Sequence, residues 1–84
     1  MYRIEFSSSA AKEFRELTGE LKKRVGVVVD KLSENPRPTG VRKLAVSEKL
    51  YRVRVGDYRI VYEINDGASA IRITRIRHRK EAYR

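Results

Sequence analysis

The feature that most constrains the fold is a set of three alternating segments joined by very short turns. These segments cover residues 50–55, 58–64 and 70–77, and the turns contain Gly56-Asp57 and Asn65-Asp66-Gly67. Alternation of polar and apolar residues is typical of half-buried strands, and small residues in the turns accept positive φ or cap their own backbone. Because turns this short join antiparallel neighbours, the segments predict a three-strand antiparallel meander.

The first half of the chain predicts one strand and two helices. Residues 2–6 alternate as a strand does, and the serines of residues 7–9 offer N-caps for a first helix that breaks at Thr18-Gly19. A second helix ends at Asn35-Pro36, because a residue before proline avoids the helical conformation. The apolar residues that share one helix face are Ala11, Phe14 and Leu17, then Leu21, Val25, Val28 and Leu32. The two helices therefore form an αα-hairpin whose apolar faces need a sheet.

These elements define an α+β protein with a small, mostly antiparallel sheet packed on the helices. A further short strand is predicted near residues 41–46, after a loop at residues 36–40. With 84 residues, we expect residues 1–84 to form a single domain, near the lower limit for a self-sufficient core.

Composition narrows the function classes. The chain has no cysteine, so it has no disulfide or thiolate metal site, and a cytoplasmic location is expected. It has no apolar run long enough to span a membrane, and no cluster with metal-ligand spacing, so a reaction without metal or other cofactor is expected. The net charge of +9 is uneven: residues 41–84 hold twelve Lys/Arg against five Asp/Glu. Such a field favours a polyanionic ligand.

Strand alternation predicts where this charge lies. Tyr51, Val53 and Val55 share one face of their strand, and Arg52 and Arg54 share the other. The residues predicted to join that second face from the next two strands are Arg59, Val61, Glu63, Arg72 and Thr74. Like charges directly opposite each other destabilise a sheet, so a face with one acid among four arginines indicates anion binding rather than an ordinary solvated surface.

The last strand departs from strict alternation. Since Ile71 and Ile73 face the core, Arg75 and Arg77 would also point inward unless a bulge or the strand end turns them away. A local conflict of this kind is where a functional site is expected.

Three stretches resemble the RelE/ParE superfamily of bacterial and archaeal toxins: Lys43-Leu44, the gapless block of residues 50–62, and the tail of residues 78–84. The resemblance covers nearly the whole chain and implies the RelE-like microbial RNase fold. It also implies a toxin of a type II toxin–antitoxin system that enters the ribosome and cleaves the mRNA codon in the A site by attack of the RNA 2′-hydroxyl. An antitoxin that wraps the toxin, the ribosome and mRNA are the implied partners.

Two other functions stay open at this point. One is the ParE-like alternative, in which the same fold inhibits DNA gyrase by protein binding without RNA cleavage. The other is a basic RNA- or DNA-binding domain without catalysis.

The resemblance also implies site residues. Those assigned to catalysis are Arg54, Arg59, Arg79 and Tyr83; those assigned to RNA binding are Arg52, Lys43, Arg77, His78 and Lys80. Related toxins place lysine at one or both of positions 52 and 54. Arginine stays protonated in proteins, so Arg52 and Arg54 cannot act as general base. Tyr83 is expected either to take that role or to stack on a base, and His78 either to donate a proton or to brace the tail.

Overall fold

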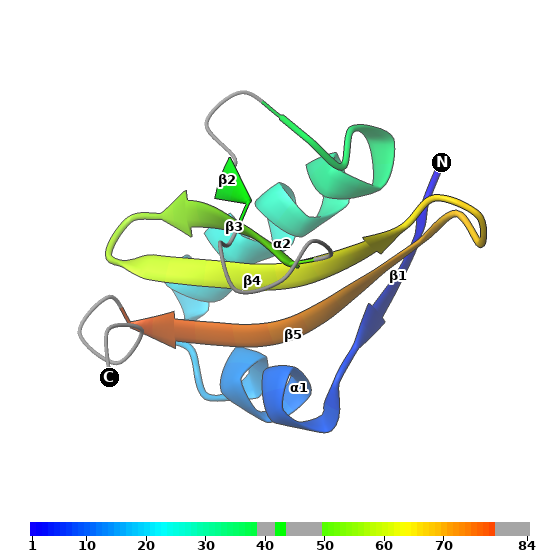
Figure 1. Cartoon of the computed structure of the whole chain (residues 1–84). Coiled ribbons are helices and arrows are strands. Elements are labelled where there is room, and N and C mark those ends of the chain that lie inside the picture. The colour runs from blue at the N-terminus through cyan, green and yellow to red at the C-terminus, as the bar shows by residue number, and fades with distance from the viewer. Residues whose placement is uncertain (39–41, 44–49, 79–84) are drawn as a thin grey trace.

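The computed structural model describes residues 1–38, 42–43 and 50–78, and Figure 1 shows their arrangement. The elements in chain order are β1 (Arg3–Phe6), α1 (Ser8–Arg15), α2 (Gly19–Glu34), β2 (Arg42–Lys43), β3 (Leu50–Val55), β4 (Tyr58–Asn65) and β5 (Ala70–His78). The predicted α+β class, the αα-hairpin and the three-strand meander are confirmed. Neither described helix is long and apolar enough to cross a membrane.

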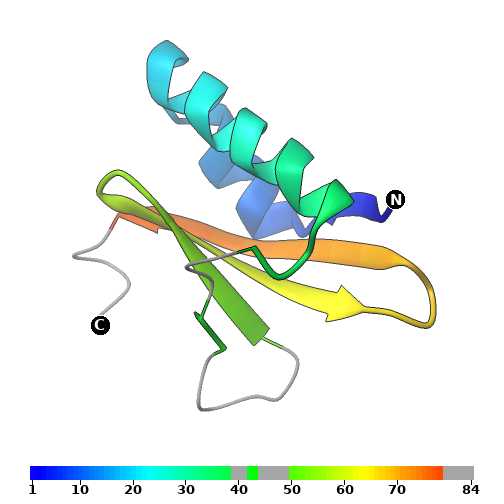
Figure 2. The same ribbon diagram turned by 90° about the horizontal axis from the view of Figure 1, so that it is seen from above.

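The strands form one sheet in the order β1-β5-β4-β3-β2. β1 runs parallel to β5, and every other neighbouring pair is antiparallel. Both helices lie on the same side of this sheet, as Figure 2 shows from above. The opposite side of the sheet, called the outer face below, is therefore not covered by either helix.

The start of α1 is fixed to the sheet by one serine. The Ser7 hydroxyl oxygen accepts a hydrogen bond from the Ala10 N–H at 3.0 Å, as an N-cap does. The same hydroxyl donates to the Thr74 carbonyl of β5 at 2.9 Å. A residue predicted as a cap thus also anchors the helix beside β5. α2 ends at Glu34, with Asn35 as its C-cap, so the predicted stop before Pro36 is confirmed.

The core lies between the helices and the inner face of the sheet. Its fully buried side chains are Ala10, Val25 and Leu32 from the helices and Ile60, Tyr62, Ile71 and Ile73 from the strands. In β4 the buried apolar side chains are Ile60, Tyr62 and Ile64, so Arg59, Val61 and Glu63 lie on the outer face as predicted. The helix stripes differ in part: Ala10 and Val29 are buried, whereas Ala11 and Val28 are only partly buried. The sheet is wider than a single apolar stripe, so each helix buries an adjacent position as well.

The two turns of the meander use different residues for their tight conformations. Gly56 has φ +59, a left-handed conformation that residues with a side chain rarely adopt, so glycine is favoured there. In the second turn, Ser69 has positive φ, and the Asn65 side chain accepts a hydrogen bond from the Ala68 N–H at 3.0 Å. Capping therefore holds this turn, and the positive φ falls after Gly67.

Candidate functional site

Three arginines lie in one row across the outer face, near the β3–β4 turn. In the strand register Arg54 of β3 is opposite Arg59 of β4, and Arg59 is opposite Arg77 of β5. Directly opposed residues have Cβ atoms about 4.5–5.5 Å apart. We call Arg54, Arg59 and Arg77 the arginine row. The next row along the same face holds Arg52, Val61 and Arg75.

A β-bulge in β5 creates this arrangement. The register shifts so that Tyr62 is opposite Ile73 and Val61 is opposite Arg75, which leaves Thr74 as the extra residue. The Thr74 hydroxyl donates a hydrogen bond to the Val61 carbonyl at 3.1 Å. After the bulge, Ile76 turns inward and is only 2% exposed. The conflict seen in the sequence is thereby resolved: Arg75 and Arg77 are turned away from the core.

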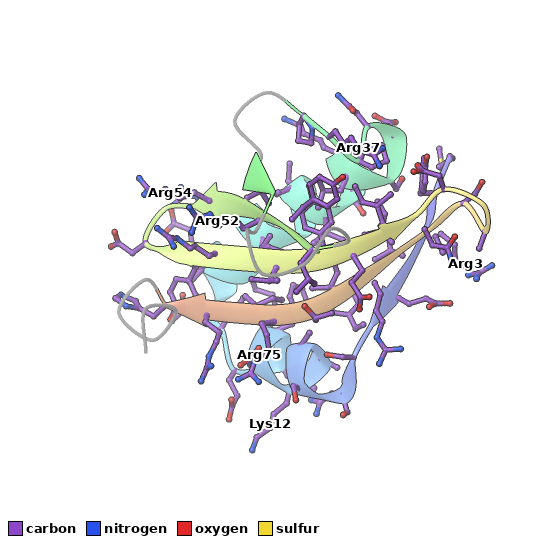
Figure 3. The ribbon with its side chains drawn as sticks, viewed as in Figure 1. Arg3, Lys12, Arg37, Arg52, Arg54 and Arg75 are labelled. Carbon is purple, nitrogen blue, oxygen red and sulfur yellow. The ribbon has the colours of Figure 1, made fainter. Side chains whose placement is uncertain are left out.

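The members of the arginine row differ in burial. Arg59 is 7% exposed and is the one charged side chain among the described residues that is buried, whereas Arg54 is exposed. Within the described part of the chain, neither Arg52 nor Arg54 forms an ion pair. Figure 3 shows these two side chains together near the β3–β4 turn. A planar guanidinium presents a fork of donors that matches phosphate oxygens, so this end of the sheet suits an anion.

Glu13 of α1 binds the β5 end of the site. One of its carboxylate oxygens accepts a hydrogen bond from the Ile76 backbone N–H at 2.8 Å. The other lies 3.0 Å from the Arg75 guanidinium and 3.7 Å from that of Arg77. Figure 3 accordingly shows Arg75 beside α1. The β3 side of the site keeps its positive charge, while its β5 side is partly neutralised by an internal acid.

Sequence reasoning missed Glu13. It lies 63 residues from Ile76 in the chain, and an acid on a helix is ordinarily a solvent-exposed residue. Only its place beside the edge of β5 beyond β1 gives it a role: it satisfies a backbone donor that no strand pairs with in the described structure.

The remaining predicted site residues lie apart from the row or outside the described residues. Lys43 is in β2, where its register partner is Tyr51 of the inner face. His78 ends β5 opposite Tyr58, and their rings meet edge to face with centroids 5.3 Å apart. Arg79, Lys80 and Tyr83 lie outside the described residues. The geometry thus brings together Arg54, Arg59 and Arg77, with Arg52 in the adjacent row.

The opposite end of the sheet holds a second charged cluster of a different kind. Arg37 donates to both carboxylate oxygens of Asp66, at 3.4 and 3.0 Å, and to the Tyr51 hydroxyl at 3.3 Å. The Tyr2 hydroxyl donates to Asp66 at 2.5 Å. The hydrogen bonds from Arg37 and then Tyr2 lower the pKa of the Asp66 carboxyl below its usual value. Within the described residues no group of acidic or histidine side chains is arranged to hold a metal ion, at either end.

Comparison with known proteins identifies the class. The family model described as "ParE toxin of type II toxin-antitoxin system, parDE" matches residues 4–83. The chain is 32% identical to the toxin RelE of Mycobacterium tuberculosis over 84 residues, which cover 99% of this chain and 87% of that protein. The chain therefore belongs to the RelE/ParE toxin superfamily.

Solved structures support the same assignment. RelE in the archaeal RelE–RelB complex from Pyrococcus horikoshii has a TM-score of 0.82 to this structure at 30% identity, with 93% of this chain and 94% of that chain covered. The isolated RelE toxin of E. coli has a TM-score of 0.84 over 99% of this chain and 92% of its own, at 24% identity, which shows the fold alone. The relatives from M. tuberculosis and P. horikoshii, at 32% and 30% identity, are both RelE toxins, and this favours a RelE-type toxin over a ParE-type one.

Proposed function

We propose that this chain is a toxin that cleaves mRNA on the ribosome, within the codon exposed in the A site. The observation that carries the proposal is the arginine row, in which the strand register sets Arg54, Arg59 and Arg77 side by side. Like charges directly opposite each other repel, and an anion bound between them relieves this repulsion. A phosphate of single-stranded RNA is such an anion.

The proposed reaction is an in-line displacement at phosphorus. The RNA 2′-oxygen forms a bond to the adjacent phosphorus and gives up its proton, the bond to the 5′-oxygen breaks, and that oxygen takes a proton. The products are a 2′,3′-cyclic phosphate and a 5′-hydroxyl. Negative charge increases on the non-bridging oxygens, where Arg54 and Arg59 donate; loss of one such donor commonly costs about 2.7–4 kcal/mol of transition-state stabilisation. Arg52 binds a neighbouring phosphate from the next row.

The residues of the tail complete the proposal. Arg79 is assigned to the transition state, with Arg77 and Lys80 binding the RNA backbone, and Tyr83 either takes the 2′-hydroxyl proton or stacks on a base. Lys43 is retained as an RNA-binding residue. His78 packs on Tyr58, which supports a bracing role over proton donation.

The proposed protein partner is an antitoxin of the RelB type. A chain with a net charge of +9 attracts an acidic segment, and the relative from P. horikoshii was solved as a RelE–RelB complex. Such a segment neutralises the toxin by covering its cationic groups. The ribosome and mRNA are the proposed targets once the antitoxin is removed, which places the activity in the cytoplasm.

Expression of the chain alone in cells, followed by primer extension on cellular mRNA, tests the proposal. Cuts within A-site codons are expected from the wild type, and Arg59→Ala is expected to reduce cleavage by about 10²–10³-fold. Arg3→Ala is the matched control, because Arg3 is an exposed arginine on β1 at the far end of the sheet (Figure 3). Uncut mRNA in cells expressing the wild type would overturn the nuclease.

A gyrase inhibitor is the second candidate, because the matching family model is that of ParE toxins. It predicts intact mRNA together with stalled gyrase on DNA. Binding to programmed ribosomes without any cleavage would instead indicate a nucleic-acid-binding domain without catalysis.

A further inference from the structure

A groove runs between α2 and β3 on the edge of the molecule, adjacent to the arginine row. It has a volume of about 410 Å³ and is lined by Lys23, Arg24, Val27, Val28, Arg54 and Val55. Val27 is 52% exposed although it lies in the middle of a helix. A concave surface that combines aliphatic side chains with a few charged groups is typical of a binding site.

We propose that this groove is the docking site for an acidic segment of the antitoxin that carries aliphatic side chains. The proposal rests on the proposed function, because it assigns the antitoxin a place on this chain. It adds how a bound antitoxin would act on the cleavage site. Arg54 lines the groove and is also a member of the arginine row.

The chemistry of the lining selects this occupant. Val27, Val28 and Val55 supply the apolar surface, while Lys23, Arg24 and Arg54 supply the cations, and none of the described residues that line the groove is acidic. An RNA strand would leave the aliphatic surface without a matching group, since bases stack on aromatic rings or guanidinium planes. A peptide with alternating carboxylates and aliphatic side chains matches both features.

The position of Arg54 explains why occupancy would inhibit cleavage. Arg54 lines the groove and also stands opposite Arg59 in the arginine row. A carboxylate bound in the groove would pair with Arg54 and remove it from the phosphate. The Arg24 guanidinium of α2 packs against Gly56 in the β3–β4 turn, so the two elements that line the groove are in contact. The groove is thus already formed without its occupant.

The test uses two substitutions in the groove that leave the arginine row intact. Lys23→Glu reverses an exposed charge, and Val27→Glu places a carboxylate on the apolar surface. Lys31→Glu is the matched control, because Lys31 is an exposed lysine of the same helix that does not line the groove. The probe is the RelB-type antitoxin that rescues growth of cells expressing this chain, titrated against each purified variant. Thermal unfolding checks that every variant is folded.

Lys23→Glu and Val27→Glu are each expected to raise the Kd for the antitoxin by roughly tenfold or more, while Lys31→Glu changes it by about twofold or less. Free toxin carrying either groove substitution is expected to cleave mRNA as the wild type does. Equal Kd values for the wild type and both groove variants would overturn the docking site. Loss of cleavage with unchanged antitoxin binding would also overturn it, since the groove would then belong to the RNA or ribosome surface.

The proposed nuclease fails by a different result. If the wild type cuts no mRNA but the groove substitutions still weaken antitoxin binding, the docking site stands and the nuclease does not. If no RelB-type antitoxin binds the wild type, the docking site and the proposed partner both fail.

Discussion

At the β4–β5 turn, Arg37 has an acid and a tyrosine as partners, whereas at the β3–β4 turn three arginines stand next to one another. The carboxylate of Asp66 accepts from Arg37 and from Tyr2, so each charge at that end is satisfied within the fold. In the arginine row, the register partner of each arginine is another arginine, and the Arg77 guanidinium also lies 3.7 Å from Glu13. The same residue type is thus paired with an acid at one end and stands beside other arginines at the other.

This difference indicates that one end stabilises the fold and that the other serves binding. A surface ion pair adds about 0–1 kcal/mol, which matters in a chain of 84 residues whose core is small. Opposed like charges cost a similar amount, so they persist where another selective advantage offsets the loss. The comparison therefore makes opposite predictions for substitutions at the two ends.

The largest expected effect is the loss of mRNA cleavage when Arg54 is substituted. Arg54→Thr removes one donor to the proposed transition state, so cleavage of A-site mRNA is expected to fall by about 10²–10³-fold. The same substitution removes a like-charge neighbour of Arg59 and places a good strand former at an exposed site. The free energy of unfolding in urea is therefore expected to rise by about 0.2–1 kcal/mol.

The matched control for that variant is Arg3→Thr, because Arg3 is an exposed strand arginine with an acidic partner, Glu5. It is expected to leave cleavage unchanged and to give no gain in stability. An Arg54→Thr protein that is both inactive and less stable would contradict the comparison.

The next effect concerns a buried tyrosine near the Arg37–Asp66 ion pair. We call that end of the sheet the paired end. Tyr62 is fully buried, and its hydroxyl donates to the Pro36 carbonyl at 2.7 Å. Tyr62→Phe leaves that carbonyl without its donor, which commonly costs about 1–3 kcal/mol. Urea unfolding measures the loss, and cleavage by the folded variant is expected to match the wild type. Tyr51→Phe is the control: it is only half-buried and bonds an exposed arginine, so an equal loss there would contradict the assignment.

The two ends were not equally predictable from the sequence. Alternation placed Arg52, Arg54 and Arg59 on the outer face, because period-two patterns in short strands leave few alternatives. The bulge at Thr74 was indicated only as a conflict between Ile73 and Arg75, and its position follows from the full register. Which arginines meet in one row depends on that register, so the arginine row could not be read from alternation alone.

The paired end was not predicted. Arg37 was assigned to a loop and Asp66 to a turn, and 29 residues separate them in the chain. Contacts between loops depend on how the helices pack against the sheet. Short-range sequence patterns do not predict that packing. Glu13 was missed for the same reason. The family resemblance supplied roles for Arg79 and Tyr83, and these stay predictions.

A smaller effect is expected where the arginine row meets Glu13. Glu13→Gln keeps an oxygen that accepts from Ile76 N–H but removes the negative charge beside Arg75 and Arg77. RNA binding should become tighter by a few fold and more sensitive to salt, since each added phosphate contact steepens the slope of log K against log salt by about 0.7 for single strands. Fluorescence titration of a 2′-deoxy-substituted, uncleavable RNA between about 50 and about 200 mM salt measures both.

Glu16→Gln is the control for that experiment, because Glu16 is an acid at the end of the same helix with no ion pair to the described residues of β5. An unchanged salt slope in Glu13→Gln would mean that Arg75 and Arg77 do not reach the RNA.

The smallest expected effect is a dependence of stability on acid pH at the paired end. The folded-state pKa of Asp66 is lowered by Arg37 and Tyr2, so the ionised carboxylate favours folding. This contribution is present above the ordinary carboxyl pKa of about 3.9 and is lost as pH falls through the lowered folded value. Asp66→Asn should therefore lower Tm at neutral pH, and the difference from the wild type should shrink toward pH of about 2. Asp57→Asn, in the turn beside the arginine row, is the control, because Asp57 forms no ion pair in the described structure. A Tm difference between wild type and Asp66→Asn that is as large at acid pH as at neutral pH would show that the cluster acts through packing and not through charge.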